Sequence, residues 1–267
     1  MTSTTLQLSE PYGAVTCQRA GRGDPVVLIH GVGMQSAAWG PQIEALSLTH
    51  QVIVLDMPGH GGSAPLTEGA ELPDYVAWLH AVLQALYLGP VSLAGHSMGA
   101  LIAGGYAVSH PENVARVALL NGVFRRSADA RAAVEDRAAE IRAGSFDLET
   151  PLARWFGESA TDQAARAQVA GWLSAVNLQG YAAAYTAFAR GDSTYADGFA
   201  GIRCPLLALT GDGDPNSTPA MAQAMADAVP QGRAVVIEGH RHMVNLTAPA
   251  AVNAALQGWL DTEGATS

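Results

Sequence analysis

Residues 95–99 read Gly-His-Ser-Met-Gly and place a serine between two glycines, where an apolar run ends and a helical pattern begins. A turn between a strand and a helix holds such a serine in a strained backbone and leaves its Oγ exposed. The small flanking residues let the strand and the helix approach closely, and the first N–H groups of the helix are available to the reaction centre. This spacing predicts that Ser97 is a nucleophile.

A serine nucleophile needs a general base at neutral pH, and the chain contains eight histidines. Where such a turn carries the serine, the histidine is expected in a loop after the last strand. Residues 238–243, Glu-Gly-His-Arg-His-Met, meet this condition and offer His240 and His242. We favour His242 as the base, because His240 directly follows Gly239 at the expected strand exit and is better placed to orient the loop.

The acid of such a site is expected between the serine and the histidine in the chain. Residues 206–211 form an apolar run that leads into Asp212 and Asp214. We favour Asp214, because three residues beyond Gly211 the chain has turned toward the histidine loop, whereas Asp212 lies between glycines and suits a turn. Asn121 ends another expected strand, but its amide carries no charge to stabilise an imidazolium, so it is not a candidate acid.

An oxyanion formed at this serine needs two hydrogen-bond donors. One is the backbone N–H of Met98, the residue after the nucleophile. The other is expected from residues 30–34, His-Gly-Val-Gly-Met, which follow the first apolar run. We expect the N–H of Val32 to be this donor and Gly31 to contact substrate, because glycine lets the backbone approach a ligand closely.

Six short apolar runs, separated by helical patterns, must position these residues. Runs of this kind are typical of parallel strands that helices cover on both faces; they span residues 26–30, 52–56, 91–95, 114–121, 206–211 and 234–238. Helices are expected over residues 72–88, 98–109, 219–229 and 249–260. The alternation predicts an α/β fold with a mostly parallel central sheet flanked by helices.

Residues 124–200 interrupt this alternation, because they are rich in alanine and contain no convincing strand. We expect a helical cap over the strand ends, inserted into a core of residues 1–123 and 201–267. Arg125 and Arg126 follow a strand end directly and are best placed to bind a substrate carboxylate. Trp155 is a further candidate substrate contact, although most aromatic residues of the insertion are expected to pack against the core.

The amino-acid composition limits the kinds of molecule that this protein is expected to bind. The net charge is −10 with only 14 lysines and arginines, which gives no basic surface for nucleic acid. No apolar run approaches the about 18 residues that span a bilayer, and residues 1–10 lack a secretory pattern, so a cytoplasmic location is expected. The two cysteines lie in no metal-binding or disulfide pattern. A small-molecule substrate is expected, and the sequence leaves open whether the protein forms a homodimer.

Together these motifs resemble the α/β-hydrolase superfamily along nearly the whole chain. The resemblance is greatest to its small capped members, which include enol-lactonases, carboxylesterases, C–C bond hydrolases and cofactor-free haloperoxidases. The matching segments are residues 30–33, 56–63, 95–99, 211–214 and 239–242. The resemblance implies an α/β-hydrolase fold without metal or organic cofactor, with Ser97 as nucleophile, Asp214 as acid, His242 as base, and Val32 and Met98 as oxyanion donors.

The expected reaction is a two-step acyl transfer to water through an acyl-enzyme. Its substrate is a small ester, lactone or amide, with a carboxylate-bearing molecule among the options. Three alternatives share the same motifs: cleavage of a C–C bond in a vinylogous diketone, a perhydrolase or haloperoxidase reaction, and a slow-turnover ligand receptor or signalling protein. The fold does not distinguish between them.

Overall fold

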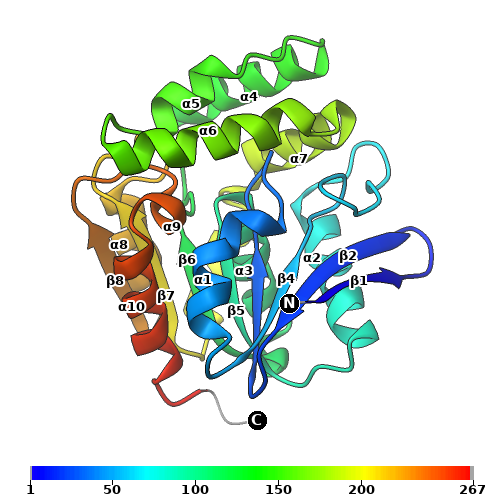
Figure 1. Cartoon of the computed structure of the whole chain (residues 1–267), viewed down its shortest axis with the longest axis vertical. Helices are drawn as coiled ribbons and strands as arrows, with labels where there is room; N and C mark the ends of the chain where they lie inside the picture. Colours follow the sequence, from blue (N-terminus) through cyan, green and yellow to red (C-terminus); the bar gives the residue numbers. More distant parts are fainter. Residues whose placement is uncertain (1, 265–267) are drawn as a thin grey trace.

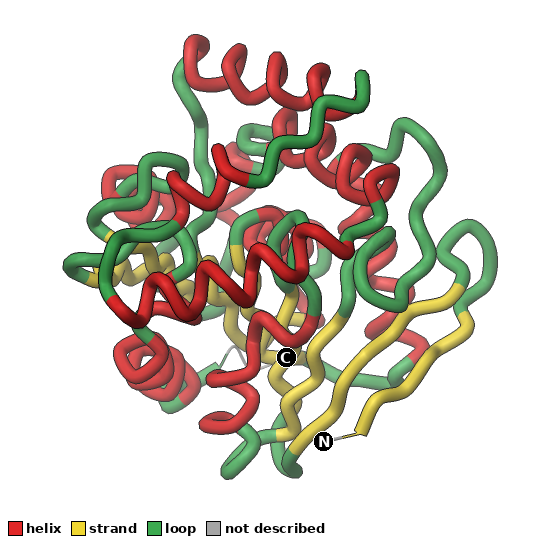
Figure 2. The backbone as a smooth tube through the Cα atoms, turned by 45° about the horizontal axis from the view of Figure 1, so that its top comes forward, coloured by secondary structure: helices red, strands yellow, loops and turns green. Residues whose placement is uncertain are grey.

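A single eight-stranded sheet forms the centre of the computed structural model, which describes residues 2–264. The strand order is β1-β2-β4-β3-β5-β6-β7-β8, with β3 to β8 parallel and the β1–β2 hairpin antiparallel at one edge (Figures 1 and 2). The bounds are β1 Thr2–Gln7, β2 Ala14–Ala20, β3 Pro25–Ile29, β4 Gln51–Leu55, β5 Val91–His96, β6 Val114–Leu120, β7 Leu206–Gly211 and β8 Gly232–Ile237. The predicted α/β-hydrolase architecture is confirmed.

The six predicted strands are present within two residues of their expected bounds, whereas β1 and β2 were not predicted. These two strands are only partly buried and rich in polar residues, so they lack the continuous apolar run of a strand covered on both faces. In the centre, Val26 of β3 pairs with Val52 of β4 and Ser92 of β5. The valines are fully buried, as expected for a parallel sheet covered by helices.

Helices cover both faces of this sheet. One face packs against α1 and α10 and the other against α2, α3 and α8, so that alternate residues of each central strand enter two separate apolar clusters. The helices outside the insertion are η1 Ser36–Trp39, α1 Gly40–Leu46, α2 Leu72–Ala85, α3 Met98–Ser109, η2 Pro111–Asn113, α8 Pro219–Asp227, α9 Val244–Thr247 and α10 Pro249–Leu260. The four predicted helices are all present, and α3 and α10 have the predicted bounds.

Residues 124–200 form α4 Ala128–Arg142, α5 Glu149–Trp155, α6 Ala160–Ala175, α7 Leu178–Gly191 and part of η3 Ala196–Gly201. These helices lie together above the carboxyl ends of the strands (Figure 1, green). One contact with the loops below is close enough to require glycine: a Cβ on Gly59 would lie 2.6 Å from Gly180 Cα at the start of α7. In the described part of the chain, no helix is long and apolar enough to cross a membrane.

Candidate active site

Ser97 is the single residue between β5 and α3, and its backbone is strained. Its φ of 55° and ψ of −113° lie outside the regions that L-residues ordinarily adopt. The neighbouring glycines explain how the turn closes, because a Cβ on Gly95 would lie 2.0 Å from Gly99 O, and one on Gly99 would lie 2.2 Å from Ile29 O. The predicted strand–turn–helix context of the serine is therefore present.

The two predicted oxyanion donors lie on either side of this serine. Met98 is the first residue of α3, so its N–H has no partner within the helix. The loop after β3 approaches from the other side, where a Cβ on Gly31 would lie 3.0 Å from Ser97 Cβ. The backbone hydrogen bonds of the described residues leave the N–H of Val32 unused. Both N–H groups thus lack a backbone partner among the described residues, and their role as oxyanion donors stays a prediction.

Two buried histidines hold the loop after β3 in place. Nε2 of His60 accepts from the N–H of Gly33 at 3.0 Å, and Nε2 of His30 accepts from the N–H of Met57 at 3.0 Å. Burial lowers the pKa of both histidines, to about 3 for His30. Neutral rings are required here, because a protonated Nε2 has no lone pair to accept these bonds.

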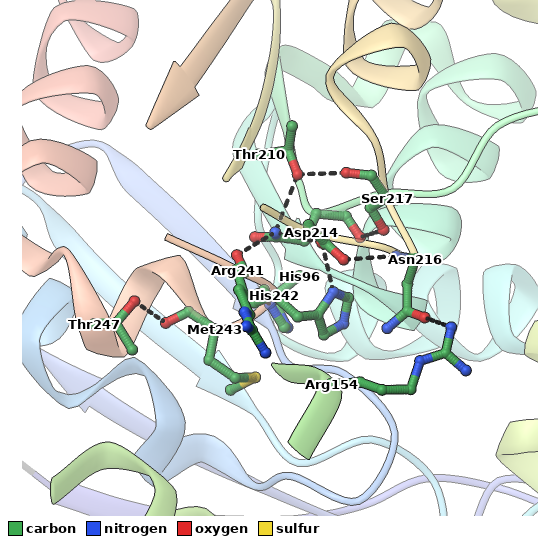
Figure 3. A network of polar contacts seen from close by, with 11 residues as sticks. His96, Arg154, Thr210, Asp214, Asn216, Ser217, Arg241, His242, Met243 and Thr247 are labelled. Atoms are coloured by element: carbon green, nitrogen blue, oxygen red, sulfur yellow. Dashed lines mark hydrogen bonds and ion pairs between the residues drawn. The ribbon is translucent and has the colours of Figure 1, made fainter. Parts of the chain in front are cut away.

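His242 and Asp214 form a buried pair at the ends of β8 and β7. Nδ1 of His242 lies 2.7 Å from Oδ2 of Asp214, and the side chains are 4% and 0% exposed (Figure 3). Burial acts to raise the pKa of the Asp214 carboxyl, but the charge of His242 and hydrogen bonds from His242, Asn121 and Asn216 outweigh burial and lower it. An ionised Asp214 can hold the imidazole in the tautomer that leaves Nε2 free as a base.

The other two candidates of these loops have different partners. His240 Nδ1 lies 2.9 Å from Oγ1 of Thr247, and Oδ1 of Asp212 accepts from the N–H of Gly239 at 2.8 Å. Both contacts stabilise the loop rather than a reacting group. The structure therefore pairs Asp214 with His242, the two residues that the sequence favoured.

Asn121, which the sequence excluded as an acid, belongs to the same network as a donor. Its Nδ2 donates to Oδ2 of Asp214 at 2.8 Å and to Oγ1 of Thr210 at 3.2 Å. Its own backbone has a φ of 48°, and its carbonyl accepts from Oγ of Ser217 at 2.6 Å. A polar residue at the end of β6, next to β7 in the sheet, was the available signal for this contact.

His96 connects the serine turn to the histidine loop. Its Nε2 lies 2.9 Å from the carbonyl oxygen of His242, and burial lowers its pKa to about 3. The neutral ring must therefore carry its proton on Nε2 to donate this bond.

Ser97 and His242 line one cavity, and the hydrogen bonds of the described residues do not join their side chains. Such bonds are often long in ligand-free sites and shorten when substrate binds.

The cavity has a volume of about 670 Å³ and lies between the strand ends and the insertion. Gly31 and Val32 line it from the sheet side, and Arg126 and Trp155 line it from the insertion. The Trp155 ring stacks on His242, with ring centroids 5.6 Å apart and planes inclined by 30°. Space for a small molecule therefore exists directly above the serine and the histidine.

The two arginines that the sequence offered for substrate binding lie in different surroundings. Arg125 is not among the residues that line this cavity; its side chain is 54% exposed and pairs with Asp197 at 2.6 Å. Arg126 does line the cavity, with a side chain only 4% exposed and its guanidinium 4.5 Å from the centroid of the Phe188 ring. It shares Asp192 with Arg131, so two cations face one carboxylate.

Two further cavity residues, Arg137 on α4 and Arg154 on α5, were not singled out from the sequence. Arg137 forms an ion pair at 3.0 Å with Glu140, and Glu140 also lines the cavity. Nη2 of Arg154 donates to the neutral Oδ1 of Asn216 at 2.7 Å (Figure 3). No sequence signal distinguished these arginines from the others, because the packing of the insertion helices decides which side chains reach the cavity.

A protein-family model described as alpha/beta hydrolase fold matches residues 24–249. The chain belongs to this family. A hydrolase of Acinetobacter baylyi, (E)-2-((N-methylformamido)methylene)succinate hydrolase, is 53% identical over 262 residues, which are 98% of this chain and 99% of the relative. With the family match, this similarity shows that the chain is an enzyme with hydrolase activity.

Solved structures of the family share the same architecture. A malate-bound esterase from Thermogutta terrifontis superimposes with a TM-score of 0.86 and 26% identity, covering 97% of this chain and 98% of the esterase. The enol-lactonase from Burkholderia xenovorans LB400 gives a TM-score of 0.85 with 22% identity, covering 97% and 100% of the two chains. At this identity the lactonase shows the fold alone.

Proposed function

We propose that this enzyme is a serine hydrolase that cleaves the formamide bond of (E)-2-((N-methylformamido)methylene)succinate or a closely related dicarboxylated enamide. The observation that carries the proposal is a single cavity in which Ser97 and His242 lie beneath arginines of the insertion. The name of the relative that is 53% identical supplies the substrate class. We also propose that residues 124–200 act as a cap over the core.

The chemistry of this compound matches the cavity. Its name describes a formyl group on a methylated nitrogen, joined through a double bond to a succinate with two carboxylates. The net charge of −10 disfavours an anionic ligand at long range, so local cations must hold it. Arg137 is neutralised by Glu140, whereas Arg126 shares one carboxylate with a second arginine and Arg154 contacts a neutral amide. Arg126 and Arg154 therefore have charge left for a substrate carboxylate.

In the first step His242 removes the proton of Ser97, whose Oγ attacks the formyl carbon. The N–H groups of Val32 and Met98 bind the resulting oxyanion. His242 then returns the proton to the substrate nitrogen as the C–N bond breaks, and 2-(methylaminomethylene)succinate departs. Asp214 stabilises the imidazolium throughout this step. The leaving nitrogen is conjugated through the double bond to a carboxyl group, which makes its departure easier than that of a simple alkylamine.

In the second step water attacks the formyl-serine with His242 as the base, and formate is released. Atoms balance as one amide and one water giving one formate and one amine. A metal or an organic cofactor is not required in either step.

The test is the release of formate from (E)-2-((N-methylformamido)methylene)succinate by the purified enzyme. The dimethyl ester of the same compound, a vinylogous diketone, and an ester assayed with and without peroxide serve as comparison substrates. We expect rapid formate release from the diacid and a much higher KM for the diester. Cleavage of the diketone without formate release from the diacid would contradict the proposal and favour C–C hydrolysis.

A further inference from the structure

The short helix α5 is attached to both loops that carry the proposed acid and base. From the histidine loop, Nη1 of Arg241 donates to the carbonyl oxygens of Ala153 and Phe156, each at 2.9 Å. From the acid loop, Asn216 accepts from Arg154 at 2.7 Å. Figure 3 shows Arg241 and Arg154 near His242 and Asn216. The insertion is thus joined to the reacting groups at this helix.

Each attachment ends next to a reacting group. Arg241 directly precedes His242 in the chain. Asn216 donates its backbone N–H to Oδ1 of Asp214 at 2.8 Å. The ring of Trp155, the last residue of α5, stacks on His242. A displacement of α5 would therefore move the substrate-binding side chains relative to the catalytic pair.

Apart from these attachments, α5 is held by Leu152 and Trp155, which pack in and against the core cluster, and by Asp147, which caps its first turn. It has seven residues, of which only Leu152 is buried, and an isolated helix shorter than about 12 residues is marginal in water. Its first turn forms an ion pair between the exposed Glu149 and the half-buried Arg166, and ion pairs at the surface contribute little. At the C-terminal end of α5, Arg241 donates to carbonyl groups. The last carbonyl groups of a helix have no partner within the helix, and a cation is favoured at this end.

We propose that Arg241 is a positioning residue that clamps α5 to the catalytic loops and so places Arg154 for recognition of an anionic substrate. The inference rests on the proposed function, because Arg154 matters only if the substrate carries a carboxylate. The clamp acts through α5 and touches neither the substrate nor the reacting atoms. It makes selection of the charged substrate depend on a side chain of the histidine loop.

The test compares Arg241→Met with Arg241→Lys and with Arg233→Met, an exposed arginine on β8 that serves as the matched control. For the diacid, Arg241→Met should raise KM about tenfold, the effect of losing one charge-assisted hydrogen bond to the substrate. For the neutral p-nitrophenyl acetate, kcat/KM should change less than about threefold, which is the range of small surface effects. Arg241→Lys should be intermediate, because lysine can still donate to a carbonyl, and Arg233→Met should match the wild type.

Two further measurements separate the clamp from a general loss of structure. The double variant Arg154→Met/Arg241→Met should have the KM of Arg154→Met alone, because both changes remove the same contact. Amide hydrogen exchange over residues 149–156 should be faster in Arg241→Met than in Arg233→Met. Equal losses on charged and neutral substrates, additive effects, or unchanged exchange would each overturn the inference. If the wild type does not hydrolyse the diacid, the proposed function fails, and hydrogen exchange alone decides whether Arg241 holds α5.

Discussion

The carboxyl edge of the sheet and the helical insertion face each other across one cavity, but their side chains are held in different ways. At the sheet edge, backbone geometry and buried hydrogen bonds fix the groups: Ser97 has a φ of 55°, and Asp214 is fully buried with His242 as its partner. In the insertion, α4 buries only Ala138 and Ile141, and most ion pairs are at least partly exposed.

This difference separates two kinds of property. Substitutions of the serine, the acid and the base at the sheet edge should lower kcat for every substrate, because all acyl transfers use the same groups. Substitutions in the insertion should change KM and only for charged substrates, because the arginines bind the ground state and the transition state alike. The comparison fails if a variant of Ser97, Asp214 or His242 acts selectively or if an insertion variant abolishes all turnover.

The largest expected effect comes from the serine. Ser97→Ala should stay folded and lose about four to six decades of kcat on charged and neutral substrates alike. His242→Ala should cost as much, because the two residues act as a unit, whereas His240→Ala should cost far less. Steady-state kinetics on the diacid and on p-nitrophenyl acetate measure this. Retained turnover in Ser97→Ala would rule out the assigned nucleophile.

Substitution of the acid should have the next largest effect on kcat. Asp214→Asn should lower kcat about 10⁴-fold through loss of the correct imidazole tautomer. Asp212→Asn is the matched control and should be mild, because Asp212 only accepts the N–H of Gly239. If the two variants ranked in the opposite order, the turn after β7 would supply its other aspartate as the acid.

Asn121 should have a smaller effect of the same kind. Asn121→Leu keeps the size of the side chain but removes the donor to Asp214 Oδ2, and loss of a hydrogen bond to a charged group corresponds to about a tenfold to hundredfold fall in kcat. KM should be unchanged, and circular dichroism should verify folding. A change in KM at constant kcat would place Asn121 with the substrate contacts instead.

On the insertion side of the cavity, Arg154→Met should raise KM for the diacid about tenfold to a hundredfold and leave kcat nearly unchanged. Arg125→Met is the control, because Arg125 pairs with Asp197 outside the cavity. Neither variant should affect a neutral ester. An equal effect of Arg154→Met on both substrates would remove Arg154 from carboxylate recognition.

The last expected effect is on stability in acid rather than on turnover. Burial lowers the pKa of His30 and of His96 from 6.5 to about 3, so the unfolded chain binds more protons than the folded chain between these values. The free energy of unfolding should therefore have its full value above pH 6.5. Between pH 6.5 and about pH 3 it should fall by up to about 1.4 kcal/mol per pH unit for each histidine. His30→Gln should make this decline shallower in urea titrations at pH 7, 6 and 5; an unchanged slope would contradict a neutral buried His30.

The sequence predicted the sheet edge better than the insertion, for a physical reason. The residues around Ser97 and the ends of β7 and β8 carry local signals, because glycines and polar residues follow the apolar runs of these strands. The contact between Asn121 and Asp214 joins residues 93 positions apart and depends on the order of strands in the sheet. The hairpin β1–β2 lacked a continuous apolar run, and the arginines that reach the cavity depend on how the insertion helices pack.

The central claim is that Ser97 carries the formyl group of a dicarboxylated formamide. The most direct measurement uses diacid labelled with ¹³C in the formyl group, rapid acid quenching, and mass spectrometry of the digested enzyme. We expect a labelled formyl group on the peptide that contains Ser97, its disappearance as labelled formate accumulates, and neither signal in Ser97→Ala. Formate release with the label on another residue, or no formate release by the wild type, would contradict the claim.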